Sequence, residues 1–108
     1  RLEYIMKTWQ QLRDVLQEIM GPNNKVFYQP PENLKLSYPC IVFERTNALL
    51  NYADNSPYIK TKRYTVTLIT KSADNDQYID QLLDLPMCTY DREFKNDGLV
   101  HDVFNIYF

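Results

Sequence analysis

The side chains best suited to metal binding or nucleophilic catalysis are one histidine, His101, and two cysteines, Cys40 and Cys88. A zinc site needs three or four ligands and favours close paired spacing, which these residues lack. A Cys-His enzyme would also need oxyanion-stabilising loops rich in glycine, and the chain has only two glycines. We therefore predict no enzyme, no metal and no cofactor, and a structural or interfacial role for His101.

An acidic run, Asp74-Asn75-Asp76 followed by Asp80, superficially resembles a calcium-binding loop. It lacks the central glycine and the terminal glutamate that such a loop requires. Helix capping explains these carboxylates better, because they accept from free N–H groups and favour the positive end of a helix.

Basic residues cluster in Lys60-Thr61-Lys62-Arg63. Strand alternation would put Lys60 and Lys62 on one face and Arg63 on the other. Four residues cannot make a nucleic-acid footprint in a chain whose formal net charge is -2. We interpret the cluster as a solvated or subunit-bridging face.

Apolar residues recur at spacings of three and four through the first twenty residues. This pattern predicts an amphipathic helix over residues 2–20, about 30 Å long. Its apolar stripe consists of Leu2, Ile5, Met6, Trp9, Leu12, Leu16 and Ile19. Gly21-Pro22 is expected to end the helix, because a glycine cap is followed by a helix breaker. The stripe needs a flat apolar surface to pack on.

Residues 26–29, 40–46 and 58–71 read as strands of an antiparallel sheet. In the third of these, Tyr64, Val66 and Leu68 alternate with polar residues and are predicted to face inward. The same parity continues back to Lys62 and Lys60, so this strand should be longer than the core it covers. We expect the hairpin that joins the second and third strands to project from the body.

The loop of that hairpin, residues 47–57, is longer than a hairpin turn needs. It carries Leu49, Leu50 and Tyr52 without a local core to receive them. One interpretation is a mobile surface excursion. The other is an arm that orders against a neighbouring subunit or the next ring of an assembly.

A short helix should follow, capped by Ser72 or Asp74 and ended by Pro86, with a stripe of Tyr78, Ile79, Leu82 and Leu83. A C-terminal hairpin over residues 87–94 and 99–108 would turn at residues 95–98, where Asp97-Gly98 tolerates positive φ angles. The whole chain, residues 1–108, therefore predicts one α+β domain with both helices packed on the sheet.

No segment resembles a signal peptide, and no apolar run approaches the roughly 20 residues that span a bilayer. Two separate cysteines suit a reducing compartment, where both thiols would act as small buried apolar groups. We expect a soluble cytoplasmic product with no membrane contact.

Several strings from Val26 onward resemble, in order, the tail terminator (tail completion, head-tail joining) family of long-tailed bacteriophages of Gram-positive hosts. They are Tyr28-Gln29-Pro30-Pro31, Tyr38-Pro39-Cys40-Ile41-Val42-Phe43-Glu44-Arg45, Leu85-Pro86-Met87-Cys88-Thr89-Tyr90-Asp91-Arg92 and Asp97-Gly98-Leu99-Val100-His101-Asp102-Val103-Phe104-Asn105-Ile106-Tyr107. The resemblance implies a small α+β virion subunit, assembled in the host cytoplasm and located at the head-tail junction.

The same resemblance implies a homo-hexameric ring that caps the head-proximal end of the tail tube and ends its polymerisation. Its partners would be the major tail tube protein and the head completion or stopper connector protein. Genomic DNA would pass through the lumen without specific binding, which suits a slight acidic excess. Parity and loop position suggest Leu49, Leu50, Tyr52, Tyr58, Lys60, Lys62 and His101 as interface residues, with a weaker candidate in an exposed edge over residues 101–107.

Two alternatives to a tail terminator remain open at this point. A head completion or stopper protein also forms a ring at this junction, but such proteins tend toward a β-barrel, which the predicted N-terminal helix disfavours. A small nucleic-acid-binding module with aromatic strands as a stacking platform is the other, and it would need a basic lining beside exposed aromatics.

Overall fold

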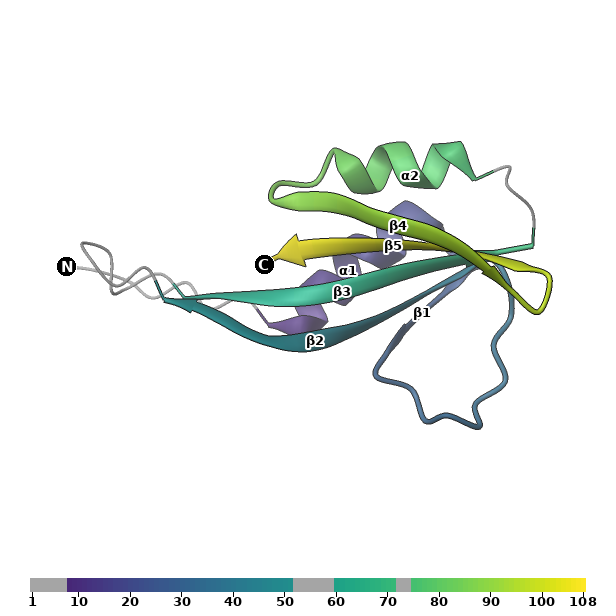
Figure 1. The fold of residues 1–108 in the computed structure, drawn as a ribbon, viewed down its shortest axis with the longest axis horizontal. Helices are drawn as coiled ribbons and strands as arrows, with labels where there is room; N and C mark the ends of the chain where they lie inside the picture. The colour runs from purple at the N-terminus through teal and green to yellow at the C-terminus, as the bar shows by residue number, and fades with distance from the viewer. Residues whose placement is uncertain (1–7, 52–59, 72–74) are drawn as a thin grey trace.

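The computed structural model describes residues 8–51, 60–71 and 75–108. In them two helices pack on a five-stranded mixed sheet, which confirms the predicted α+β class (Figure 1). The elements in chain order are α1 (Trp9–Met20), β1 (Lys25–Tyr28), β2 (Cys40–Asn51), β3 (Lys60–Thr70), α2 (Asp76–Leu83), β4 (Cys88–Asn96) and β5 (Leu99–Tyr107). None of the helices described is long and apolar enough to cross a membrane.

The strand order is β1-β2-β3-β5-β4, so β1 and β4 are the edge strands. The prediction of a wholly antiparallel sheet is wrong at one place, because β1 pairs with β2 in parallel. Residues 29–39 allow this, since they are long enough to return the chain to the start of β2. The suggestion that residues 101–107 form an exposed edge is also wrong, because β5 lies between β3 and β4.

Helix α1 is shorter than predicted. Thr8 has an extended backbone, and its side chain accepts from the Gln11 N–H while the Gln11 side chain accepts from the Thr8 N–H. This reciprocal cap starts the helix at Trp9 rather than Leu2. As predicted, the helix ends at Gly21, which has φ 86° and donates its N–H to the Gln17 carbonyl. The other stripe residues Leu2, Ile5 and Met6 lie outside the described residues.

Strands β2 and β3 continue together past their neighbours. Pairing of β1 with β2 ends at Phe43, and pairing of β5 with β3 ends at Arg63, whereas β2 and β3 remain paired to Asn51 and Lys60. The prediction that residues 47–51 are loop is therefore wrong. A bulge between Arg45 and Leu49 interrupts the alternation that marks a strand, which hid this extension.

The second helix and the last hairpin lie where they were predicted. The N-cap of α2 is Asn75; the expected caps Ser72 and Asp74 lie outside the described residues. The helix ends at Leu83, before Pro86. The hairpin turns at Asp97 (φ 54°) and Gly98 (φ 75°), and two successive positive φ angles match the right-handed twist of the flanking strands.

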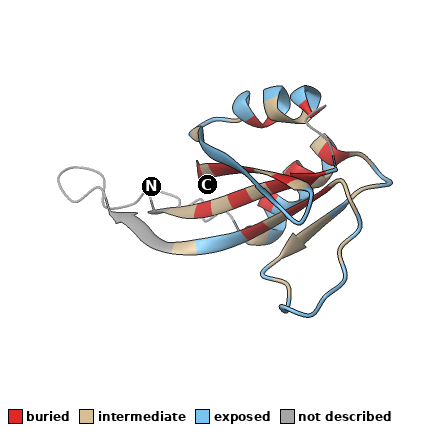
Figure 2. Ribbon diagram, turned by 45° about the vertical axis from the view of Figure 1, so that its right-hand side comes forward, coloured by how far each residue is buried: buried red, intermediate tan, exposed pale blue. Residues whose placement is uncertain are grey.

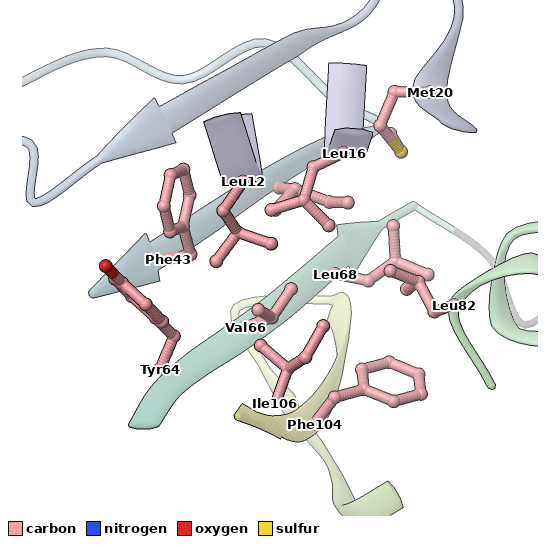
Figure 3. Packing of buried hydrophobic residues seen from close by; sticks show 11 residues of the cluster. Leu12, Leu16, Met20, Phe43, Tyr64, Val66, Leu68, Leu82, Phe104 and Ile106 are labelled. Carbon is pink, nitrogen blue, oxygen red and sulfur yellow. The ribbon is translucent and has the colours of Figure 1, made fainter. Parts of the chain in front are cut away.

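The core lies between the helices and one face of the sheet (Figures 2 and 3). Its side chains are Leu12, Leu16 and Met20 of α1, Leu82 of α2, and Ile41, Phe43, Tyr64, Val66, Leu68, Phe104 and Ile106 of the sheet. The predicted inward parity of Tyr64, Val66 and Leu68 is thus confirmed. Trp9 closes one end of the core, where its ring stacks on Tyr28 at 4.4 Å between centroids.

Candidate functional site

The three side chains first considered for chemistry are not brought together. Cys88 pairs with Ile106 and His101 with Phe94, so the two positions are five residues apart along β5, about 17 Å, and have opposite parity. His101 is half-buried, its ring stacks on Phe94 at 4.7 Å, and its Nδ1 lies 3.3 Å from the Leu99 carbonyl oxygen. Among the described residues, no group of three potential ligands is placed to hold a metal ion.

The two thiols are poor nucleophiles in this fold. Cys40 is fully buried and Cys88 is half-buried, and both are free. Burial raises the pKa of each thiol to about 11, because it penalises the thiolate. At neutral pH both therefore remain neutral apolar groups, which agrees with their predicted packing role.

The predicted interface residues fall into two places. Leu49 pairs with Lys62 through the backbone, Leu50 pairs with Thr61 and Lys60 with Asn51, so the β2–β3 extension brings Leu49, Leu50, Lys60 and Lys62 together in one ladder. Tyr52 and Tyr58 lie outside the described residues. His101 lies elsewhere, on the face of the sheet opposite α1.

A buried polar network around Asp102 was missed by the sequence analysis. Asp102 is 0% exposed and has the inward parity of Phe104 and Ile106. The Tyr90 hydroxyl donates to its Oδ1 at 2.8 Å, and Asn75 Nδ2 donates to its Oδ2. Asn75 is 2% exposed and also donates to Thr70 Oγ1 at 3.4 Å. The network therefore joins the edge strand β4 and the start of α2 to β5.

A bulge in β4 places two residues at this network. Tyr90 pairs with Phe104, yet Arg92 pairs with Val103, so Asp91 is an extra residue. Because of this extra residue, Glu93 pairs with Asp102, and Glu93 and Tyr90 both have inward parity. Strict alternation from the inward position of Tyr90 would have put Glu93 on the opposite face. The alternation of β5 was the available signal, since it puts Asp102 inward between Val100 and Phe104.

The network raises the pKa of two of its members, Glu93 and Tyr90. Hydrogen bonding to Asp102 and the charge of Asp102 raise the pKa of Glu93, because a proton shared by two carboxyl groups removes their repulsion. Lys95 opposes this rise and Asp76 adds to it. Withdrawal from water, the bond to Asp102 and the nearby carboxylates raise the pKa of Tyr90 to about 12.

We expect the contribution of Glu93 to the free energy of unfolding to fall as pH rises above about 4.5, the unperturbed pKa of a glutamate. The pKa of Glu93 is raised in the folded state, so its stabilisation is complete below the unfolded pKa and is lost as pH rises through the folded one. Glu93→Gln should flatten this part of the profile and raise stability at neutral pH, since an amide can donate to Asp102. Urea unfolding from pH 4 to pH 8 measures this, with exposed Glu32→Gln as the matched control. An unchanged slope in Glu93→Gln would show that another group causes the pH dependence.

The sheet face opposite α1 has no described helix packed on it, and it faces the viewer in Figure 1. It carries the Phe94–His101 stack, and the Arg92 guanidinium lies 5.9 Å from the Phe94 ring centre. Arg92 also pairs with Asp91 at 2.6 Å, which offsets its charge.

Three surfaces of the described residues remain as candidate sites. They are the outer edges of β1 and β4, the face opposite α1 and the β2–β3 extension. Comparison with models of known protein families and with curated proteins finds no match to this chain.

Proposed function

We propose that this chain is a structural subunit of a ring at the head-proximal end of a phage tail tube, where it ends tube polymerisation and provides the head-tail joining surface. The observation that carries the proposal is the β2–β3 ladder, which continues after β1 and β5 have stopped pairing. A two-stranded ladder is marginally stable alone, because it has too little apolar surface to bury. Contact with a neighbouring molecule would supply that surface.

The ladder is the base of the proposed projecting arm, which includes Leu49, Leu50 and Tyr52. In a ring, each subunit must meet the next through a heterologous contact that closes after a fixed number of copies. An arm that clasps a neighbour is one way to make such a contact, and addition of a strand at the free edge of β4 is another. Both are compatible with partners above and below the ring, namely the tube protein and the connector.

The alternatives fit the described fold less well. An open sheet with β1 and β4 as free edges differs from the β-barrel expected of a stopper protein. A nucleic-acid module would need a basic lining beside exposed aromatics, and Arg92 beside Phe94 is the nearest approach to it on the face opposite α1. Because Asp91 neutralises Arg92 and the chain is acidic overall, we favour the ring subunit.

Replacing Leu49, Leu50 and Tyr52 together with serine is expected to leave a folded domain that no longer joins heads to tails. The three positions belong to the proposed arm, so we expect the loss to appear in assembly and not in stability. The measurement is the yield of joined particles when the triple variant replaces the native subunit, with circular dichroism as the test of folding.

A matched control replaces two exposed apolar residues outside the proposed contacts, Leu34 and Met87, with serine. This control should assemble normally. The direct test of the ring function is negative-stain imaging of the native protein with polymerising tail-tube subunits. Capped tubes of arrested length are expected, whereas unaffected tube growth without density at the ends would contradict the proposal, as would a normal particle yield from the triple variant.

A further inference from the structure

Helix α2 carries an acidic stripe that has no cationic partner in the described part of the chain. Asp76, Asp80 and Asp84 are spaced by four residues, and all three are exposed. Residues at this spacing lie on one side of a helix, about 6 Å apart along its axis. The helix contains no lysine or arginine, and the ion pairs found among the described residues do not involve the stripe.

The β2–β3 ladder carries a matching row of two cations. Lys62 lies on β3, and Tyr64 takes the next alternate position of that strand, about 6.6 Å away. The partner of Tyr64 on β2 is Arg45, which is exposed. The two cationic residues therefore follow one another along the ladder at a step close to the 6 Å spacing of the aspartates. Arg45 and the half-buried Lys62 make no ion pair with any described residue.

The two rows do not meet within one chain. Helix α2 packs on α1 and β4, and none of the ion pairs found among the described residues joins it to β2 or β3. In Figure 1 the ladder extends well beyond the end of α2, so the two rows lie in different parts of the molecule. A second copy of the chain presents both rows in the same geometry.

We propose that the row of Lys62 and Arg45 in one copy binds the α2 aspartate stripe of the next copy. The contact is heterologous, because each copy uses its ladder on one side and its helix on the other, and such contacts propagate into rings. It rests on the proposed ring function and deepens it by naming the surface that receives the base of the arm. Complementary charges would also steer successive copies into one orientation.

A charge-swap experiment tests the contact in the full chain. The ladder variant is Arg45→Glu with Lys62→Glu, and the helix variant is Asp80→Lys with Asp84→Lys. Asp76 is left unchanged because it lies in the first turn of α2 and affects Glu93. The control variant, Glu18→Lys with Glu32→Lys, makes the same change in net charge as the helix variant at exposed acids outside the stripe. Sedimentation velocity at low and high salt measures self-association, and thermal unfolding verifies that each variant is folded.

Native protein should self-associate at low salt and dissociate at high salt, since exposed charge pairs are screened. Each swapped variant alone should associate about tenfold more weakly, because two attractive pairs become repulsive. An equal mixture of the two variants should regain the native association, since the acidic ladder of one meets the basic helix of the other. The control variant should behave like the native chain.

A mixture that fails to associate would overturn the contact, and so would a native protein that remains monomeric at low salt. The native chain could instead bind DNA through the cationic row. In that case the ladder variant would lose DNA binding, and mixing it with the helix variant would not restore the binding. The tube-capping assay separates the two proposals. If the native protein caps tubes and the charge-swap variants cap them equally well, the contact is refuted and the terminator function is not. Association restored by mixing, with no capping of tubes, refutes the terminator function alone.

Discussion

Phe104→Ala is expected to destabilise the domain by about 3–5 kcal/mol, the usual loss for a buried phenylalanine. Phe104 is 0% exposed and lies in the core with Val66, its register partner on β3, and Ile106. Its ring also contacts Tyr90 edge to face at 5.2 Å. Removing the ring leaves a cavity that the flanking strands cannot close without breaking their pairing. Because domains are stable by about 5–15 kcal/mol in total, the variant should be partly unfolded near body temperature.

Urea unfolding measures this loss, and Phe94→Ala on the neighbouring strand β4 is the matched control. Phe94 is 40% exposed and lies on the opposite face of the sheet, so its removal should cost about 1 kcal/mol or less. Equal losses in the two variants would show that the helix-covered face is not the main core of the domain.

Asp102→Ala is expected to cost about 2–3 kcal/mol, because it leaves buried polar partners without an acceptor. Asn75 is the main one, since its amide would keep only the weaker bond to Thr70. Tyr90 is 42% exposed and its hydroxyl can turn to water, so it should contribute less. Loss of the Glu93–Asp102 repulsion acts in the opposite direction. The variant is therefore best compared in a Glu93→Gln background, where this repulsion is absent.

A double-mutant cycle with Asn75→Ala measures the coupling between the two buried groups. If Asp102 and Asn75 satisfy each other, the double variant should lose about 1 kcal/mol less than the sum of the single variants. Strict additivity would mean that the two side chains act independently. Asp91→Ala is the control at an exposed aspartate of the same hairpin, and it should have little effect.

The Asp102 network also bears on the proposed assembly. It ties β4, which is a free edge of the sheet, and the N-terminus of α2, which begins the aspartate stripe, to the central strand β5. Loosening this network should therefore disturb two of the surfaces proposed to meet neighbouring copies. Side chains that orient an interface from beneath in this way act through position, without touching the partner.

The sequence by itself determined most of the local structure. Strand alternation identified Tyr64, Val66 and Leu68 as inward-facing, and the Asp97-Gly98 pair located the last turn, because both signals depend on neighbouring residues alone. The end of α1 at Gly21 was predicted correctly for the same reason. The start of α1 was predicted at Leu2 because the apolar stripe continues without a break past Thr8. The capping bonds between Thr8 and Gln11, which the apolar pattern does not reveal, start the helix at Trp9.

Only the tertiary structure decided how these elements meet. The direction of β1 depends on where residues 29–39 return the chain, and the extension of β2 depends on a bulge that β3 stabilises by pairing across it. The bulge in β4 likewise sets Glu93 against Asp102. In each case partners far apart in the chain decide the outcome, because the gain in free energy comes from backbone pairing and burial between segments, which no local pattern records.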